Sequence, residues 1–405
     1  MQTNLISRRR RVASSANIPN RRGGIIVLAA AILVALFAFT AFVVDVGYIT
    51  LTKAELSKAA DGAALAAVSE QPEAFGPGAT VTSLVADNSG RSWASAVGNA
   101  NETADRNSTF LNTTRDVRYG KYQWNPASSK WEKFWNETPY NMAEVTFRRN
   151  VSEGGTASTA GDGPLDLFFA PVFGTYRAGT QASSIAAMLP AVGFRIKPGS
   201  TAKCGILPIA LDLETWEALI NDHVGTDSYS YSPSTGRVSA GGDGVLEVNL
   251  YPNGTADLPP GNRGTVDIGP TNNSTADLNR QILEGINDDD LAALEAQGTQ
   301  LRWDDGPITL NGDPGLSAGI KEELEAIKGQ PRAIPIFSAV SGPGNNAMYT
   351  IVKFVGIRIM FVQLTGKPTS KKVIIQPAPM IDPTAVTGNK VITNDTVWGP
   401  AALIQ

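Results

Sequence analysis

The pattern of apolar and polar positions changes character near residue 45. Residues 25–44 contain no charged side chain, and thirteen of them are Ile, Leu, Val or Phe. At a rise of about 1.5 Å per residue, a helix of about twenty residues spans about 30 Å, which is the thickness of the hydrocarbon layer of a bilayer. The run therefore predicts one membrane-spanning helix.

A second pattern continues the helix beyond the apolar run. Small and apolar residues recur at helical spacing after Asp45, and Pro72 disfavours helical geometry at the residue before it. We expect one helix from the membrane to about Ser69, with an outer half that presents a stripe of small side chains. The residues at helical spacing are Leu51, Leu56, Ala59, Ala60, Ala63, Ala64 and Ala67, and the stripe of small side chains runs from Leu56 to Ala67.

The residues before the apolar run predict its orientation. Six arginines and no acidic residue precede it, and such an excess of positive charge holds a flank in the cytoplasm. A cleaved signal peptide is the alternative, but its apolar core is usually only about 7 to 15 residues long. The length favours an uncleaved anchor with the N-terminus in the cytoplasm and the rest of the chain outside.

The segment around this helix resembles a known family. A basic tip, the residues RRGG, an apolar helix and then a fixed set of polar and small residues are similar to the N-terminal segment of TadE/TadG-like proteins of the bacterial Flp (tight-adherence) pilus assembly system. The resemblance implies a minor pilin-like or assembly protein in the inner membrane. Its motif residues here are Asp45, Gly47, Tyr48, Leu56, Ala60, Asp61, Ala64 and Ala67.

Two departures from the family pattern change the expectations. Cleavable Flp prepilins carry Glu five residues after the cleavage Gly, whereas Ala29 follows Gly24 at that distance. We therefore expect residues 1–24 to be retained. Some TadG proteins also carry a von Willebrand A domain with a metal motif, but the nearest sequence here, residues 87–91, ends in Arg91 where the motif needs Ser. We expect no such metal site.

The remaining residues predict an α+β fold with a β-rich extracytoplasmic region and a few short helices. We divide the chain into a basic cytoplasmic tip (1–22), the anchor and extended helix (23–70), a pilin-like mixed α+β region (71–191) and a β-rich C-terminal domain (192–405). Residues 71–107 have little periodicity and are predicted to form a loop or irregular connection. Runs of β-branched and aromatic residues predict four strands near the C-terminus, at 334–340, 349–354, 357–364 and 372–375.

Charge and reactive residues limit the chemistry. The net charge is −4, and without the six N-terminal arginines the remainder is more acidic, which argues against a nucleic-acid partner. Cys204 and His223 are the single residues of their types, so neither an internal disulfide nor a zinc site of ordinary composition can form. We expect no catalytic residue, cofactor, metal ion or small-molecule substrate. Oxygen ligands at residues 288–290, 304–306 and 311–313 leave calcium open, although turns and helix caps are the simpler use.

Three functions remain open at this stage. The motif favours a membrane-anchored structural or assembly component of an Flp-type pilus, whose partners would be the lipid bilayer and other pilus proteins. A tethered binding or adhesion protein would be favoured if the aromatic patch of Trp124, Trp131, Phe134 and Trp135 were exposed. A tethered enzyme is the third, limited to carboxylate chemistry.

The stripe of small residues has two interpretations. Ala60, Ala64 and Ala67 share one helix face, and close helix approach depends on such residues. The stripe is either an assembly surface for another protein or the face that packs on the chain's own sheet.

Overall fold

The protein is described from a computed structural model, over residues 22–153, 155–251, 264–270, 274–312, 318–343, 346–367 and 370–404. The basic tip predicted before the helix lies outside these residues except for Arg22.

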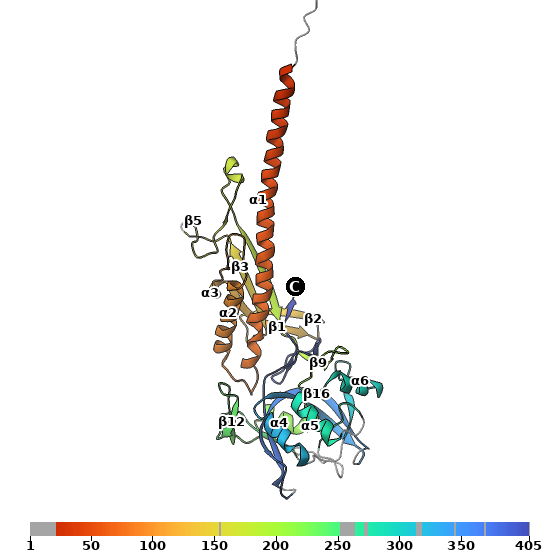
Figure 1. Ribbon diagram of the computed structural model, residues 1–405. Coiled ribbons are helices and arrows are strands. Elements are labelled where there is room, and N and C mark those ends of the chain that lie inside the picture. The colour runs from red at the N-terminus through yellow and green to blue at the C-terminus, as the bar shows by residue number, and fades with distance from the viewer. Residues whose placement is uncertain are drawn as a thin grey trace, which may run out of the picture.

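The long N-terminal helix α1, Arg22–Ser69, dominates the shape of the molecule (Figure 1). Its 48 residues correspond to about 72 Å at the usual helical rise. The N-terminal half projects away from the rest of the chain, and the C-terminal half lies against it. The predicted continuation of the membrane helix to Ser69 is confirmed, and α1 is the one described helix that is long and apolar enough to cross a membrane.

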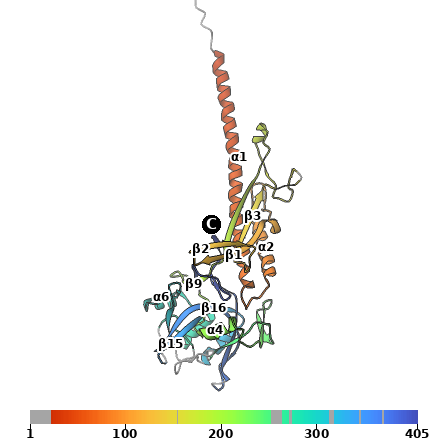
Figure 2. The same cartoon turned by 180° about the vertical axis from the view of Figure 1, so that it is seen from behind.

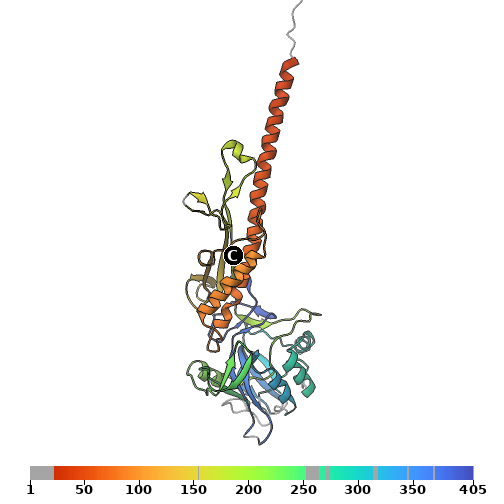
Figure 3. The same cartoon turned by 60° about the vertical axis from the view of Figure 1, so that its left-hand side comes forward.

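The C-terminal half of α1 packs against an antiparallel sheet of five strands. The sheet order is β2-β1-β3-β8-β21, and α1 contacts its β3 and β8 strands most closely. Helix α2, Ser83–Asn99, lies beside α1 (Figure 3). The strands are β1 (Val117–Asn125), β2 (Lys130–Trp135), β3 (Met142–Arg149), β8 (Thr180–Ala187) and β21 (Ala402–Ile404).

A narrow hairpin joins β3 to β8 and rises beside α1 (Figures 1 and 2). Its short strands are β6, Leu165–Asp166, and β7, Arg177–Ala178. The 3-10 turn η2, Ala170–Phe173, forms the tip. Because β8 continues from this hairpin into the sheet, the tip points toward the N-terminal half of α1.

The second half of the chain builds a separate six-stranded sheet with helices packed on it. The long strand β16 is central and pairs with β14, β15 and β17. The strands are β10 (Leu211–Asp212), β13 (Val248–Tyr251), β14 (Ile308–Gly312), β15 (Pro331–Ser341), β16 (Ala347–Gln363) and β17 (Lys372–Pro377). The helices are α4 (Leu213–Ile220), α5 (Thr275–Glu284), α6 (Asp288–Ala296) and α7 (Lys321–Ala326).

The chain returns from this second sheet to the first one at its C-terminal end. Strand β21 pairs antiparallel with β8 and so completes the sheet that packs on α1. Buried Trp398 packs edge to face on Phe75, which follows the short turn η1, Gln71–Ala74, after α1. Strand β21 therefore belongs to the first sheet.

Two predictions about secondary structure are wrong. Residues 71–107 contain the helix α2 at 83–99, whereas the sequence predicted an irregular connection. The strands predicted at 349–354 and 357–364 are one strand, β16, which runs through Gly356. A Cβ at Gly356 would lie 2.6 Å from the Met380 Cβ, so this glycine permits a close approach and does not end the strand.

Candidate functional site

Asp45 stands at the end of the apolar run and holds the hairpin. Its Oδ1 accepts a hydrogen bond from the Phe168 N–H at 2.8 Å. Its Oδ2 accepts from the N–H groups of Phe169 at 3.0 Å and Ala170 at 2.7 Å. Phe168 and Phe169 immediately precede η2 and Ala170 is its first residue, so the carboxylate accepts from N–H groups at the start of a helical turn, where such groups have no partner within the turn. Tyr48, one turn later, packs edge to face on Phe168 with ring centres 5.2 Å apart.

The next motif residues lie in the core between α1 and the sheet. Leu56, Ala60, Ala64 and Ala67 are each fully buried and belong to the core cluster that includes Val145 and Phe147 of β3. Their small side chains let the helix axis come close to the strands.

Asp61 makes the polar contact of this face. Its Oδ1 accepts a hydrogen bond from the Ser184 hydroxyl of β8. The sheet therefore holds α1 through a carboxylate as well as through apolar packing.

Helix α2 covers another side of α1 through small residues of its own. Ala86, Gly90, Ala94 and Gly98 are the buried residues of α2 and stand four apart, so they share one face. A Cβ at Gly90 would lie 2.5 Å from the Ala67 carbonyl oxygen of α1. The two helices therefore meet at backbone distance.

The stripe at Ala60, Ala64 and Ala67 lies inside the fold. All three side chains are buried in the core cluster between α1 and the first sheet. Apart from Gly47, the motif residues fasten the first sheet and its hairpin to α1. The partners of Asp45, three consecutive backbone amides in a hairpin, could not be identified from the sequence because they lie more than a hundred residues away.

Gly47 is the motif residue without a role in this intrachain packing. It is exposed, and a Cβ there would have no heavy atom within 4 Å. Val43, Leu51 and Ala54 are exposed too, and their spacing places them with Gly47 on the face of α1 opposite Asp45. We call these four residues the free ridge of α1.

The aromatic patch predicted on the first sheet is half-buried. Trp131 stacks on Tyr122 with ring centres 4.9 Å apart, and its Nε1 donates to the Asn389 Oδ1 at 2.9 Å. Trp135 lies under the Arg118 guanidinium at 3.7 Å. Phe134 is 38% exposed. These rings are engaged within the chain, so the patch is not an open aromatic platform.

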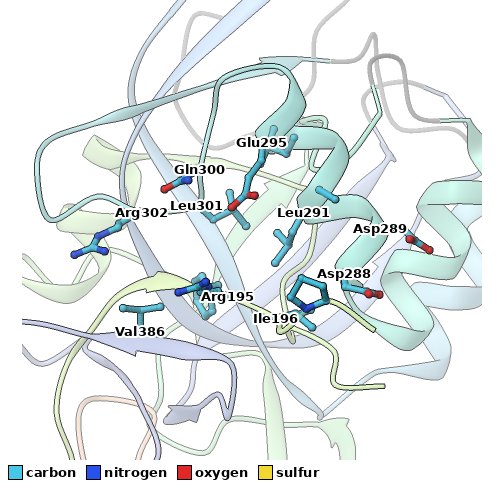
Figure 4. Close-up of a pocket in the computed structure, with 14 residues that line it drawn as sticks. Arg195, Ile196, Asp288, Asp289, Leu291, Glu295, Gln300, Leu301, Arg302 and Val386 are labelled. Carbon is cyan, nitrogen blue, oxygen red and sulfur yellow. The ribbon is translucent and has the colours of Figure 1, made fainter. Parts of the chain in front are cut away.

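A hollow of about 490 Å³ lies beside α6 in the second half of the chain (Figure 4). Its charged groups come from five residues, Arg195, Asp288, Asp289, Glu295 and Arg302. Arg302 pairs with Asp304 at 2.6 Å, and Asp288 accepts a hydrogen bond from the Gly199 N–H at 2.7 Å. The described lining residues include no Ser, Thr, Cys or His, so they supply neither a Ser–His nor a Cys–His pair, and their reactive groups are carboxylates.

Neither the single histidine nor the single cysteine is among the residues that line this hollow. His223 is exposed on a turn with a φ of 58°. Cys204 is buried, its Sγ accepts a hydrogen bond from the Thr384 hydroxyl at 2.9 Å, and burial raises the pKa of the thiol to about 12. Among the residues that the structure describes, no three His, Cys, Asp or Glu side chains gather where they could hold a metal ion.

Comparison with known proteins identifies the anchor segment. Residues 23–70 match the family model described as putative Flp pilus-assembly TadE/G-like. No curated protein and no solved structure matches the chain. The matched segment coincides with α1 and contains every motif residue, so the family resemblance predicted from the sequence is confirmed for this segment.

Proposed function

We propose that the protein is a membrane-anchored, non-enzymatic structural or assembly component of a bacterial Flp-type pilus, similar to a minor pilin. The observation that carries the proposal is the TadE/G-like match over residues 23–70, together with the folding of this same segment as one unbroken helix. One half of α1 is apolar and exposed, and the other half forms the core of the first sheet domain.

The orientation follows from the charge beside the apolar run. Arg21 and Arg22 directly precede it, and four further arginines lie at positions 8–11. Positive flanks remain cytoplasmic. We therefore place the N-terminus in the cytoplasm, α1 in the inner membrane and both sheets on the outer side of that membrane.

The free ridge is the surface that we propose for contact with a second pilus protein. It lies on the exposed side of α1, opposite the side that holds the sheet, and it begins where the apolar run ends. Gly47 and Ala54 would allow a partner helix to approach closely, and such packing drives helix association in and near membranes. The buried alanines of the motif would then act indirectly, by holding the ectodomain on the other side.

Photo-crosslinking in cells that make the pilus tests this proposal. A photoreactive side chain at Leu51, which is 56% exposed, should give crosslinks to another pilus or pilin-like protein. Lys53 provides the matched control, because it is also exposed and two residues away but lies off the ridge.

Two results would contradict the proposal. Equal crosslinking from Leu51 and Lys53 would show that the ridge is not a specific contact. Normal pilus assembly and adherence in a strain that lacks the protein would remove the pilus function altogether and favour a tethered binding protein.

A further inference from the structure

The tip of the hairpin is unusually apolar for a surface loop. Residues 167–176 contain no charged side chain. Five large apolar or aromatic side chains of this segment are exposed to 44% or more. They are Phe168, Phe169, Val172, Phe173 and Tyr176. Grouped exposed apolar residues of this kind mark an interaction surface.

The tip lies at the level of the membrane-spanning part of α1. Asp45, where the apolar run ends, is bonded to the three N–H groups that begin η2. Within residues 25–44, only Ala38 and Ala41 are partly covered, and both lie on the same helix face as Asp45. Figures 1 and 3 show the hairpin rising beside this part of the helix. The tip therefore reaches past Asp45 toward the middle of the apolar run.

Charges resume at the base of the hairpin. Asp166 and Arg177 flank the uncharged segment and pair with each other at 2.7 Å, with both side chains exposed. The hairpin thus carries charges at its base, aromatic rings at its sides and apolar side chains at its tip. This order matches the change of environment from water through the headgroups into the hydrocarbon of a bilayer.

We propose that the hairpin tip inserts into the outer leaflet of the bilayer that α1 spans, as a second membrane contact beside the anchor. Val172 and Phe173, exposed to 82% and 73%, enter the acyl-chain region. Tyr176 lies in the headgroup region, where amphipathic rings are enriched. The occupant is lipid because the exposed tip is continuous with the lipid-facing surface of α1. The inference rests on the proposed insertion of α1 and adds that the ectodomain contacts the membrane surface directly.

Depth-dependent quenching in vesicles tests this contact. The full-length protein carrying Val172→Cys is labelled with an environment-sensitive NBD fluorophore and reconstituted in phosphatidylcholine and phosphatidylglycerol vesicles. Native Cys204 is fully buried and should remain unlabelled, which the unsubstituted chain checks. The positive control is Val34→Cys, at an exposed position of the membrane helix. The negative control is Ser234→Cys, in the exposed turn between β11 (Tyr229–Ser232) and β12 (Arg237–Ala240) of the second half.

The expected result is specific in depth. The label at residue 172 should be quenched by nitroxide lipids at least half as strongly as the label at residue 34, and more by a nitroxide near the headgroup than by one near the acyl-chain end. The label at residue 234 should not respond. Because Val172 is exposed, its substitution should leave the fold intact.

The controls separate the ways in which the idea can be wrong. Quenching at 34 with none at 172 would overturn the insertion of the tip and leave the anchor standing. No quenching at 34 would contradict the anchor itself. A blue-shifted label at 172 without lipid quenching, which disappears as the protein is diluted in lipid, would show that a second copy covers the tip and would also overturn the proposal.

Discussion

The crossing of α1 and α2 gives the sharpest quantitative prediction. Gly62 of α1 and Gly90 of α2 both lie inside helices of this interface, so replacing either by Ala removes the same backbone flexibility. The loss of this flexibility in the unfolded chain raises the free energy of unfolding by about 1 kcal/mol for a helix interior. The two sites differ in the space that a new Cβ would meet.

The space at each site sets the expected magnitude. At Gly62 the nearest atom is a methyl group of Val97 at 3.3 Å, which needs a shift of a few tenths of an ångström. At Gly90 the Cβ would lie 2.5 Å from the Ala67 carbonyl oxygen and still closer to the Tyr119 hydroxyl. Carbon atoms in contact are about 3.5 to 4.0 Å apart, so the helices would have to separate by about 1 Å. Overpacking of this kind costs about 1 to 3 kcal/mol.

Gly62→Ala should therefore be neutral or up to about 1 kcal/mol more stable than the native chain. Gly90→Ala should be less stable than Gly62→Ala by about 1 to 3 kcal/mol. Urea denaturation of the full-length protein in detergent, followed by tryptophan fluorescence, measures both. Equal stability of the two variants would show that α1 and α2 are not held at backbone distance, and the account of the small residues in α2 would be wrong.

Two further predictions concern charged groups. Asp45→Ala should speed amide hydrogen exchange at Phe168, Phe169 and Ala170 by about tenfold or more, because three donors lose a charged acceptor. The control Asp61→Ala should leave the exchange rates of these amides unchanged. Equal protection of the amides in the two variants would contradict the capping role of Asp45. Burial of Asp395 raises its pKa. The charge of Lys353 at 2.6 Å and hydrogen bonds from Thr393 and Trp216 together lower the pKa by more than burial raises it, so the folded pKa lies below the ordinary 3.8. Its stabilisation is thus present above about pH 4 and is lost as the pH falls through the folded pKa. Asp395→Asn should cost about 1 to 3 kcal/mol at neutral pH and flatten the loss of stability in acid, as denaturation across pH would show; an unchanged acid profile would refute this assignment.

The full length of α1 could be predicted from the sequence because two independent patterns of residues both indicate a helix there. The uncharged run predicts the membrane half, and the helical spacing of Leu56, Ala60 and Ala64 predicts the outer half. Local pattern and tertiary packing favour the same structure there, since the alanines that are good helix formers are also the residues that the sheet needs.

Helix α2 was missed because local pattern and packing disagree. Gly90 and Gly98 each weaken an isolated helix by about 1 kcal/mol, and no large apolar stripe marks the buried face. The packing of Ala86, Gly90, Ala94 and Gly98 against neighbouring backbone offsets that cost only in the folded protein. A four-residue repeat of small residues is the available signal, but the surrounding Ser and Asn give the segment the composition of a loop.

The family motif is therefore best understood as a joint between membrane and ectodomain. Asp45 and Tyr48 hold the hairpin at one end of the outer half of α1, and Asp61 with the buried alanines holds β3 and β8 along the remainder. Because these contacts run along the outer half of α1, a partner that shifts or rotates the helix through the free ridge should move the first sheet with it. Strand β21 and Trp398 connect that domain to the second sheet, so the displacement would reach the end of the molecule farthest from the membrane. For the pilus function proposed above, such a link would transmit assembly at the membrane to structures outside it, and a flexible linker in the place of residues 45–69 should abolish pilus assembly.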